Sequence, residues 1–134
     1  MLLTRECDYG LRIIRALSKG GKITAEEICA EESIPGQFAY KILKKLERAG
    51  FIMSSRGREG GYWLVKSVTE ITIYDVVSSI DETLFVNECL RGDRPCQRNL
   101  NDDPCKVHIE FERVQDALEK ELRKKTISQI VAGE

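Results

Sequence analysis

The sequence predicts a mainly α-helical fold in which three short helices lead into a β-hairpin and one long helix follows near the carboxyl end. Three observations predict it. Apolar residues recur at helical spacing over three segments of the first 50 residues. Two apolar runs, 51–53 and 62–65, flank a glycine-rich turn, which is typical of a hairpin. Beyond residue 106, apolar residues spaced by three or four indicate a longer amphipathic helix.

Polar residues and glycines mark the ends of the first two helices. Thr4 can cap the first helix, and Gly20-Gly21 ends it. Thr24 and Glu27 form a capping box that opens the second helix, because each side chain can bond a free amide at the other's position. The apolar faces expected of these helices comprise Cys7, Leu11, Ile14, Leu17, Ala25, Ile28 and Cys29, so that two of the five cysteines are interpreted as small core residues.

A third helix and the hairpin complete a winged helix-turn-helix. Pro35 suits the first turn of the third helix, and Gly50 stops it. A helix, a short helix, a break and an amphipathic helix follow one another in the helix-turn-helix order, and a hairpin directly after them is a wing. Residues 1–80 are therefore expected to form a winged helix-turn-helix DNA-binding domain. The third helix is expected to bury Phe38, Ile42, Leu43, Leu46 and Ala49.

Two further segments follow this domain, whose last helix is capped by Thr72. Residues 81–105 form a cysteine-rich loop, and residues 106–134 form a long dimerisation helix and a short helix opened by Thr126 and Gln129. One apolar seam on the charged long helix predicts a partner helix across a two-fold axis, whereas packing against the amino-terminal domain is the alternative. The seam comprises Val107, Phe111, Val114, Leu118 and Leu122.

Charge is distributed unevenly along the 134 residues, although the net charge is only −1. Residues 1–66 hold 12 Lys and Arg against 8 Asp and Glu, a net charge of +4, and residues 67–134 hold 9 against 14, a net charge of −5. A basic amino-terminal half indicates a polyanionic partner, and the helix-turn-helix order makes double-stranded DNA the expected one.

The chain is expected to be cytoplasmic and free of membrane segments. Residues 1–6 lack the apolar centre of a signal peptide, and no apolar run approaches the roughly 18 residues that span a bilayer. Five cysteines in a reducing compartment favour metal or redox chemistry over a disulfide framework.

The third helix carries a polar face that is expected to contact DNA. Early residues of a recognition helix reach base edges in the major groove. Gln37 can read adenine and Lys41 can read guanine, whereas Lys44 and Lys45 are expected at phosphates. Tyr40 can contact a thymine methyl group or a phosphate. A solvated charged face is the alternative interpretation.

The tip of the hairpin strengthens the DNA interpretation. Arg56 and Arg58 flank Gly57, and arginines on a wing can enter a narrow minor groove, where the potential is most negative. The glycines of the turn are expected to allow close approach of the backbone to DNA. A turn that is merely soluble and glycine-rich is the alternative.

The loop before the long helix is a candidate metal site. Cys89, Cys96, Cys105 and His108, the only histidine, follow the pattern C-x6-C-x8-C-x2-H in a polar stretch. A loop that buries little apolar surface has no packing reason to hold three thiols. Thiolates and an imidazole suit iron–sulfur clusters, zinc or copper.

Motifs along nearly the whole chain resemble the bacterial winged-helix regulators typified by IscR, NsrR and CymR. The resemblance lies in Leu3-Thr4, Asp8-Tyr9-Gly10-Leu11-Arg12, Ile34-Pro35, Ser54-Ser55-Arg56-Gly57-x-x-Gly60-Gly61-Tyr62-x-Leu64 and Glu70-Ile71-Thr72-x-x-Asp75-Val76-Val77. It implies a homodimeric transcription factor, not an enzyme, that dimerises through the long helix. Many members hold an iron–sulfur cluster through three loop cysteines.

The resemblance also implies two candidates for the fourth cluster ligand. IscR-like members use a histidine three residues after the third cysteine for a [2Fe–2S] cluster, and His108 reproduces that spacing. NsrR-like members can use an aspartate of the first helix for a [4Fe–4S] cluster, and Asp8 occupies that place. Residues three apart at the start of a helix share a face, so Cys105 and His108 can reach one iron, and the [2Fe–2S] assignment is preferred.

Three functions remain in competition from the sequence. The first is a DNA-binding regulator that senses iron–sulfur cluster status, redox state or nitric oxide. The second is a cluster-free thiol or zinc regulator whose DNA binding is set by partner proteins, although structural zinc sites favour cysteines two to four residues apart. The third is an enzyme with a cysteine nucleophile, for which no activating constellation beyond His108 is present.

Overall fold

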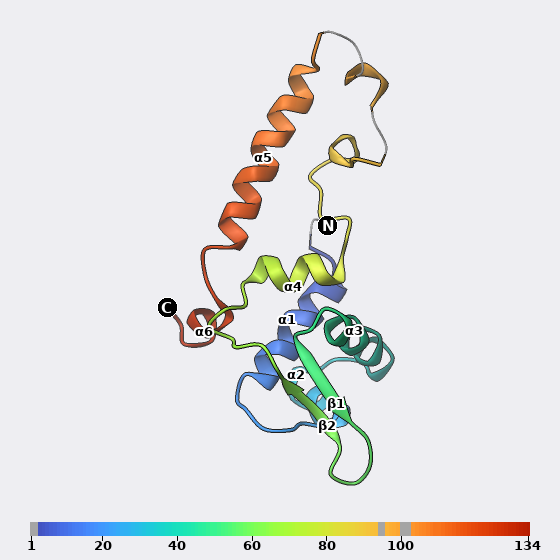
Figure 1. Cartoon of the computed structure of the whole chain (residues 1–134), viewed down its shortest axis with the longest axis vertical. Coiled ribbons are helices and arrows are strands. Elements are labelled where there is room, and N and C mark those ends of the chain that lie inside the picture. Colours follow the sequence, from blue (N-terminus) through green and yellow to red (C-terminus); the bar gives the residue numbers. More distant parts are fainter. Residues whose placement is uncertain (1–2, 94–95, 100–102) are drawn as a thin grey trace.

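A computed structural model describes residues 3–93, 96–99 and 103–134. Figure 1 shows a compact lower part, a loop that leads upward from α4, and the long helix α5 that runs back down beside it. The elements are α1 (Arg5–Leu17), α2 (Ala25–Glu32), α3 (Gly36–Arg48), β1 (Ile52–Ser55), β2 (Gly61–Leu64), α4 (Ile73–Ile80), the single-turn 3₁₀ helices η1 (Glu88–Leu90) and η2 (Gln97–Asn99), α5 (Lys106–Leu122) and α6 (Ile127–Val131). The predicted winged-helix order is confirmed.

Side-chain caps begin four of the helices at the predicted residues. The Thr4 hydroxyl accepts a hydrogen bond from the amide of Cys7 at the start of α1. Thr24, Thr72 and Thr126 each form a complete capping box, with Glu27, Asp75 and Gln129 respectively. These short polar motifs therefore set the helix boundaries, because they satisfy amides that have no partner within the helix.

The core lies where α1 crosses α3 and α4. Ile13, Ile42 and Val76 are fully buried there. Gly10 allows the close crossing, since a Cβ atom at this position would lie 2.0 Å from Cδ1 of Ile80.

The predicted face of α3 is partly wrong. Ala39 is buried in the core together with Ile42, Leu43 and Leu46, whereas Phe38 is 37% exposed and Ala49 is exposed. The reason is helical phase: the side chains that follow Ala39 by three, four and seven positions share its face, and Phe38 lies at the edge of that face. Its ring packs beside that of Tyr9 instead, with centroids 6.0 Å apart. Pro35 is the N-cap of α3 rather than part of its first turn.

The wing is a two-stranded antiparallel hairpin that is attached to the chain before α2. Ile52 pairs with Leu64, and Ser55 pairs with Gly61. Ile23 forms a bridge with Tyr62, whose amide donates to the Ile23 carbonyl at 2.8 Å. The wing is thereby fixed relative to the start of α2.

The last short helix packs on the winged domain. Ile127 of α6 is buried, and its amide donates to the carbonyl of Ile71 at 2.7 Å. The chain beyond α5 therefore returns to the domain formed by residues 1–80. Within residues 3–93, 96–99 and 103–134, no helix is both long and apolar enough to cross a membrane.

Most of the apolar seam of α5 lies outside the core that the described residues form. Val107 is 60% exposed, Val114 is 37% exposed, and the only buried residue of the helix is Gln115. Leu122, at the end of the seam, packs against the core. The alternative of packing against the amino-terminal domain is thus confined to this end of α5. In the rest of the predicted seam, Val107 and Val114 are exposed, and Phe111 and Leu118 are half-buried.

Candidate nucleic-acid interface and candidate metal centre

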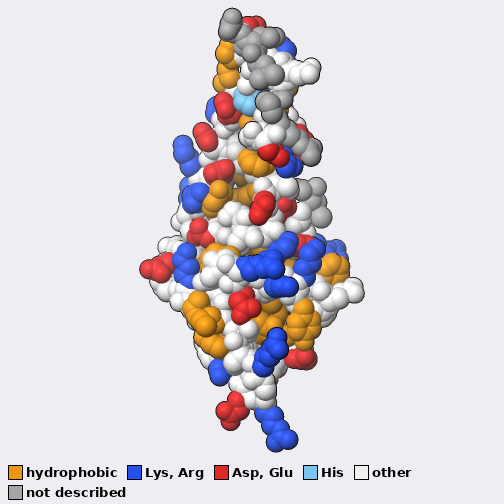
Figure 2. Space-filling model, turned by 45° about the vertical axis from the view of Figure 1, so that its right-hand side comes forward, with side chains coloured by type: hydrophobic (Ala, Val, Ile, Leu, Met, Phe, Trp, Pro, Cys, Tyr) orange, Lys and Arg blue, Asp and Glu red, His pale blue; other side chains and the backbone are white. Residues whose placement is uncertain are grey.

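A groove of about 510 Å³ lies between α3, the start of α2 and the wing. Residues that line it include Glu26, Tyr40, Lys44, Glu47, Ser54 and Arg56. The helix and the wing thus converge on one concave surface, as the sequence predicts. Gln37 and Arg58 are also exposed. Figure 2 shows basic side chains across the winged domain and at the lower tip, where the β1–β2 turn lies in Figure 1.

Three of the predicted basic residues are available for an external anion. Lys44, Arg56 and Arg58 are exposed, and none of them forms an ion pair with any residue that the structure describes. Unneutralised charges on a helix and on a wing tip suit successive phosphates of a duplex.

Lys41 and Lys45 do not share this freedom. Lys41 Nζ lies 2.6 Å from Glu6 Oε1, and Lys45 Nζ lies 3.0 Å from Glu6 Oε2 and 3.0 Å from the carbonyl oxygen of Ile80. The hydrogen bonds from Lys41 and Lys45 lower the pKa of the Glu6 carboxyl. These two lysines hold α3 to α1 and α4, and the half-buried Lys45 is placed away from the groove.

Two acidic residues that the sequence did not indicate, Glu26 and Glu47, line the groove. The Tyr40 hydroxyl donates a hydrogen bond to Glu26 at 3.0 Å, which raises the pKa of the phenol. The Ser54 hydroxyl donates to Glu47 at 2.7 Å. Carboxylates repel phosphates but accept from the amino group of cytosine, so this surface favours base contacts at these positions. Only the pairing of α2 with α3, and of α3 with β1, reveals them.

The wing glycines have intramolecular roles. Gly57 has a φ of +99°, a conformation that favours glycine. A Cβ atom on Gly60 would lie 2.5 Å from the carbonyl oxygen of Ser55, and one on Gly61 would lie 3.0 Å from that of Ile23. The turn and the Ile23 bridge thus require these glycines for steric reasons, and close approach of the backbone to DNA stays a prediction.

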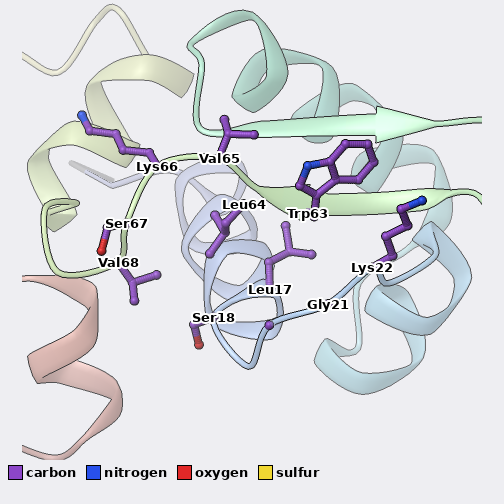
Figure 3. Close-up of a pocket in the computed structure, with 11 residues that line it drawn as sticks. Leu17, Ser18, Gly21, Lys22, Trp63, Leu64, Val65, Lys66, Ser67 and Val68 are labelled. Carbon is purple, nitrogen blue, oxygen red and sulfur yellow. The ribbon is translucent and has the colours of Figure 1, made fainter.

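The opposite face of the wing carries a second groove, of about 640 Å³ (Figure 3). Its floor is formed by Leu17, Leu64 and Val68, and Trp63 lies at one end. Lys22 Nζ lies 5.2 Å from the centroid of the Trp63 ring. This groove contains none of the predicted DNA-binding residues.

The candidate metal ligands lie in the loop and at the start of α5. Cys89 lies in η1, Cys96 directly precedes η2, and Cys105 is the N-cap of α5. The side-chain nitrogen of Asn87 donates to Cys89 Sγ at 3.1 Å, and the backbone amide of Cys105 donates to Oδ1 of Asn99 at 3.0 Å. Within the described part of the chain, no three Cys, His, Asp or Glu side chains are grouped closely enough to hold one ion. Residues 94–95 and 100–102 of the predicted loop lie outside that part.

His108 has the environment expected of a ligand. Its side chain is only 15% exposed, and its Nδ1 atom is buried without a hydrogen-bond partner among the described residues. Nε2 lies 3.3 Å from the carboxylate of Glu112. A carboxylate beside Nε2 favours the proton on that nitrogen, which leaves a lone pair on Nδ1. A buried lone pair of this kind, beside a loop that carries three thiols, fits a metal or an iron–sulfur cluster.

Asp8 is placed differently. Its carboxylate lies 2.8 Å from the guanidinium of Arg12, one turn further along α1. This ion pair would compete with metal binding by Asp8. Asp8 and Arg12 line a pocket with Ile73 and Ile127 between α1, α4 and α6. Asp8 therefore lies in the winged domain rather than in the cysteine loop.

The fold and the groove define a winged helix-turn-helix DNA-binding protein. Residues 3–133 match the model of the Rrf2 family, described as an iron-dependent transcriptional regulator, and the chain belongs to that family. It is therefore a DNA-binding transcriptional regulator and not an enzyme, as the sequence predicts.

Named relatives agree with this assignment. IscR of Escherichia coli, an HTH-type transcriptional regulator, is 27% identical over 114 residues, which are 85% of this chain and 68% of IscR. IscR of T. potens has a TM-score of 0.76 at 20% identity and covers 97% of this chain and 85% of its own. CymR, the global cysteine regulator of B. subtilis, has a TM-score of 0.73 at 22% identity and covers 98% and 96%. The two structures establish the fold.

Proposed function

We propose that the chain acts as a homodimer whose binding to an operator responds to an iron–sulfur cluster held by Cys89, Cys96, Cys105 and His108, and hence to cluster status, redox state or nitric oxide. The observation that carries this proposal is the buried Nδ1 of His108, which has no hydrogen-bond partner among residues 3–93, 96–99 and 103–134. A buried polar atom without a partner is costly, and a bound metal would remove that cost.

The donor set favours a [2Fe–2S] cluster. Three thiolates and one neutral imidazole leave less negative charge at a cluster than four thiolates, which raises its reduction potential. Asp8, the alternative ligand for a [4Fe–4S] cluster, is already paired with Arg12. When bound, the cluster would supply reversible one-electron redox chemistry, and the chain would supply its ligands and the link to DNA.

The open seam of α5 supports the homodimer. Val107, Phe111, Val114 and Leu118 follow one face of a helix that stands away from the winged domain, and the two valines are well exposed (Figure 1). A copy of the same helix would cover this face. Two winged domains in such a dimer would each place one α3 in the major groove of a pseudo-palindromic site.

The DNA contacts that we propose follow the groove. Gln37 and Tyr40 approach base edges, Lys44 approaches phosphates, and Arg56 and Arg58 approach the minor groove with the turn at Gly57. Lys41 and Lys45 act indirectly, because their bonds to Glu6 set the position of α3.

The decisive experiment is spectroscopic. Protein purified without oxygen is expected to be coloured and to contain iron and acid-labile sulfide, and removal of the cluster is expected to change its affinity for operator DNA. His108→Ala is expected to alter the visible spectrum and Asp8→Ala to leave it unchanged. The reverse pattern would favour a [4Fe–4S] cluster with Asp8, and equal operator affinity with and without the cluster would remove the sensing function.

A cluster-free regulator is the second candidate. It is favoured by the absence of a grouped ligand set among residues 3–93, 96–99 and 103–134. A colourless protein that contains zinc, or no metal, would select it. Its DNA binding would then respond to thiol state or to a partner protein.

A further inference from the structure

Gln115 is the only buried residue of α5, and its amide group is fully engaged. The side chain is 7% exposed. Its oxygen accepts a hydrogen bond from the backbone amide of Val86 at 2.8 Å. Its nitrogen donates to the carbonyl oxygen of Leu84 at 2.9 Å and to Glu119 Oε1 at 3.1 Å. A long polar side chain is seldom buried on a helix that leaves its valines exposed, so these bonds need an explanation beyond burial.

The backbone that Gln115 binds is the entrance to the cysteine loop. Leu84 is buried with the core of the winged domain, four residues after the end of α4. Val86 lies three residues before Cys89. One side chain of α5 therefore holds the chain at the point where the winged domain ends and the candidate metal loop begins (Figure 1).

The same face of α5 carries the candidate ligand. His108, Glu112, Gln115 and Glu119 are spaced by four, three and four residues, which places them on one side of a helix. His108 contacts Glu112, and Gln115 contacts Glu119. Gln115 follows His108 by seven positions, which corresponds to roughly 10 Å along the helix axis.

We propose that Gln115 couples the metal loop to the DNA-binding domain, as a positioning residue that does not itself bind metal or DNA. This inference rests on the proposed sensing function. Two hydrogen bonds from one amide fix the backbone at 84–86 against α5. A rearrangement of the loop at Cys89 and His108 is then passed to Leu84, and through it to the core beneath α3. Without the clamp, the loop can rearrange while the winged domain keeps its position.

The test compares three variants in the full-length protein. Gln115→Leu removes both bonds to the loop, and Gln115→Glu keeps an acceptor for Val86 but loses the donor to Leu84. Glu119→Gln is the matched control, because it changes the same helix face and leaves the clamp in place. Each protein is prepared with and without its cluster, and three quantities are measured: operator affinity, the visible spectrum, and hydrogen exchange of the Val86 amide.

In the wild type, removal of the cluster is expected to change operator affinity by about fivefold or more, the usual range of coupling between two sites. In Gln115→Leu the ratio of operator affinities with and without the cluster is expected to lie within about twofold of one. The ratio is expected to be intermediate in Gln115→Glu and equal to that of the wild type in Glu119→Gln. The spectrum of the cluster is expected to stay unchanged in all three variants. The Val86 amide is expected to exchange faster in Gln115→Leu, which a clamp predicts and a distant effect does not.

A wild-type ratio well away from one that persists in Gln115→Leu would overturn this inference and leave the sensing function intact. A wild-type ratio of one would overturn both. An altered cluster spectrum in Gln115→Leu would assign the residue to the metal site instead of to coupling, and would overturn the inference as well.

Discussion

The winged domain has a closed apolar core, whereas along α5 two valines of the apolar seam are exposed and the buried residue is a glutamine. Ile13, Ile42 and Val76 are inaccessible to solvent, but Val107 is 60% exposed. The first region thus contains the contacts that stabilise it. The second has an exposed apolar face beside the candidate metal ligands, and exposed apolar faces are where partners bind.

The largest expected effect lies in the open region. Val114→Glu places a charge in the middle of the α5 seam and is expected to give a monomer by analytical ultracentrifugation. Loss of the second half-site contact is expected to weaken operator binding by about 10²-fold or more, because two linked domains bind with a high effective concentration. Lys120→Gln, at an exposed position of the same helix, is the control. A Val114→Glu dimer with full affinity would show that α5 is not the interface.

A core substitution in the winged domain is expected to affect stability strongly and operator binding less than Val114→Glu does. Leu43→Ala is expected to lower the free energy of unfolding by about 2–5 kcal/mol, since the residue is fully buried and leaves a cavity. Val107→Ala is expected to change it by less than about 0.5 kcal/mol at a site that is open in the monomer. Urea unfolding at a concentration where the protein is monomeric distinguishes the two. Similar losses would mean that α5 packs on the domain in solution.

The third effect is on DNA affinity, and it is expected for basic residues of the groove and not for a basic residue on the other side of the wing. Lys44→Ala is expected to weaken binding to all DNA sequences. The slope of the logarithm of affinity against the logarithm of salt concentration is expected to fall by roughly one per protomer, which corresponds to one lost phosphate contact. Arg56→Ala is expected to weaken operator binding by about 1–3 kcal/mol and to reduce the preference for A·T pairs. Lys22→Ala, on the opposite face of the wing, is the control. Unchanged DNA affinity in both groove variants would mean that the helix and wing are misassigned.

The smallest effect concerns pH. The bonds from Lys41 and Lys45 lower the pKa of Glu6 in the folded state, so its contribution to stability is complete above its ordinary pKa of 4.5 and is lost as the pH falls through the lowered value. The carboxylate side chain is 26% exposed, and the contribution is expected to be at most about 1 kcal/mol. Glu6→Gln is expected to flatten the acid limb of a plot of unfolding free energy against pH. Glu70→Gln, at an exposed position, should keep the wild-type slope, and identical profiles for all three proteins would contradict the assignment.

Local patterns were sufficient to predict most elements of the winged domain. Thr4, Thr24, Thr72 and Thr126 act as caps because the bonds they make lie within three residues along the chain. The hairpin was predicted because its turn carries glycines that only a tight turn requires. The prediction failed at Phe38, where apolar character alone does not reveal a shift of one position in helical phase.

The roles of individual polar residues depended on contacts between distant parts of the chain. Glu6 meets Lys41 and Lys45 across 35 and 39 residues. Gln115 meets Val86 across 29 residues. No periodicity or motif marks such pairs, because each residue is ordinary within its own helix. The sequence therefore predicted that the polar face of α3 carries lysines but not which of them remain available to DNA.

The sequence by itself determined the order of helices, the wing, the apolar seam of α5 and the types of ligand in the loop, because these follow from periodicity, capping and side-chain chemistry. Only the tertiary structure decided that Lys44 faces the groove while Lys45 is held by Glu6, that Gly61 is required by Ile23, and that α6 returns to the winged domain. It also buried Nδ1 of His108 and fixed Gln115 on the loop backbone. The physical reason is that burial and pairing are set by whichever groups the fold brings together, and these lie far apart in the chain.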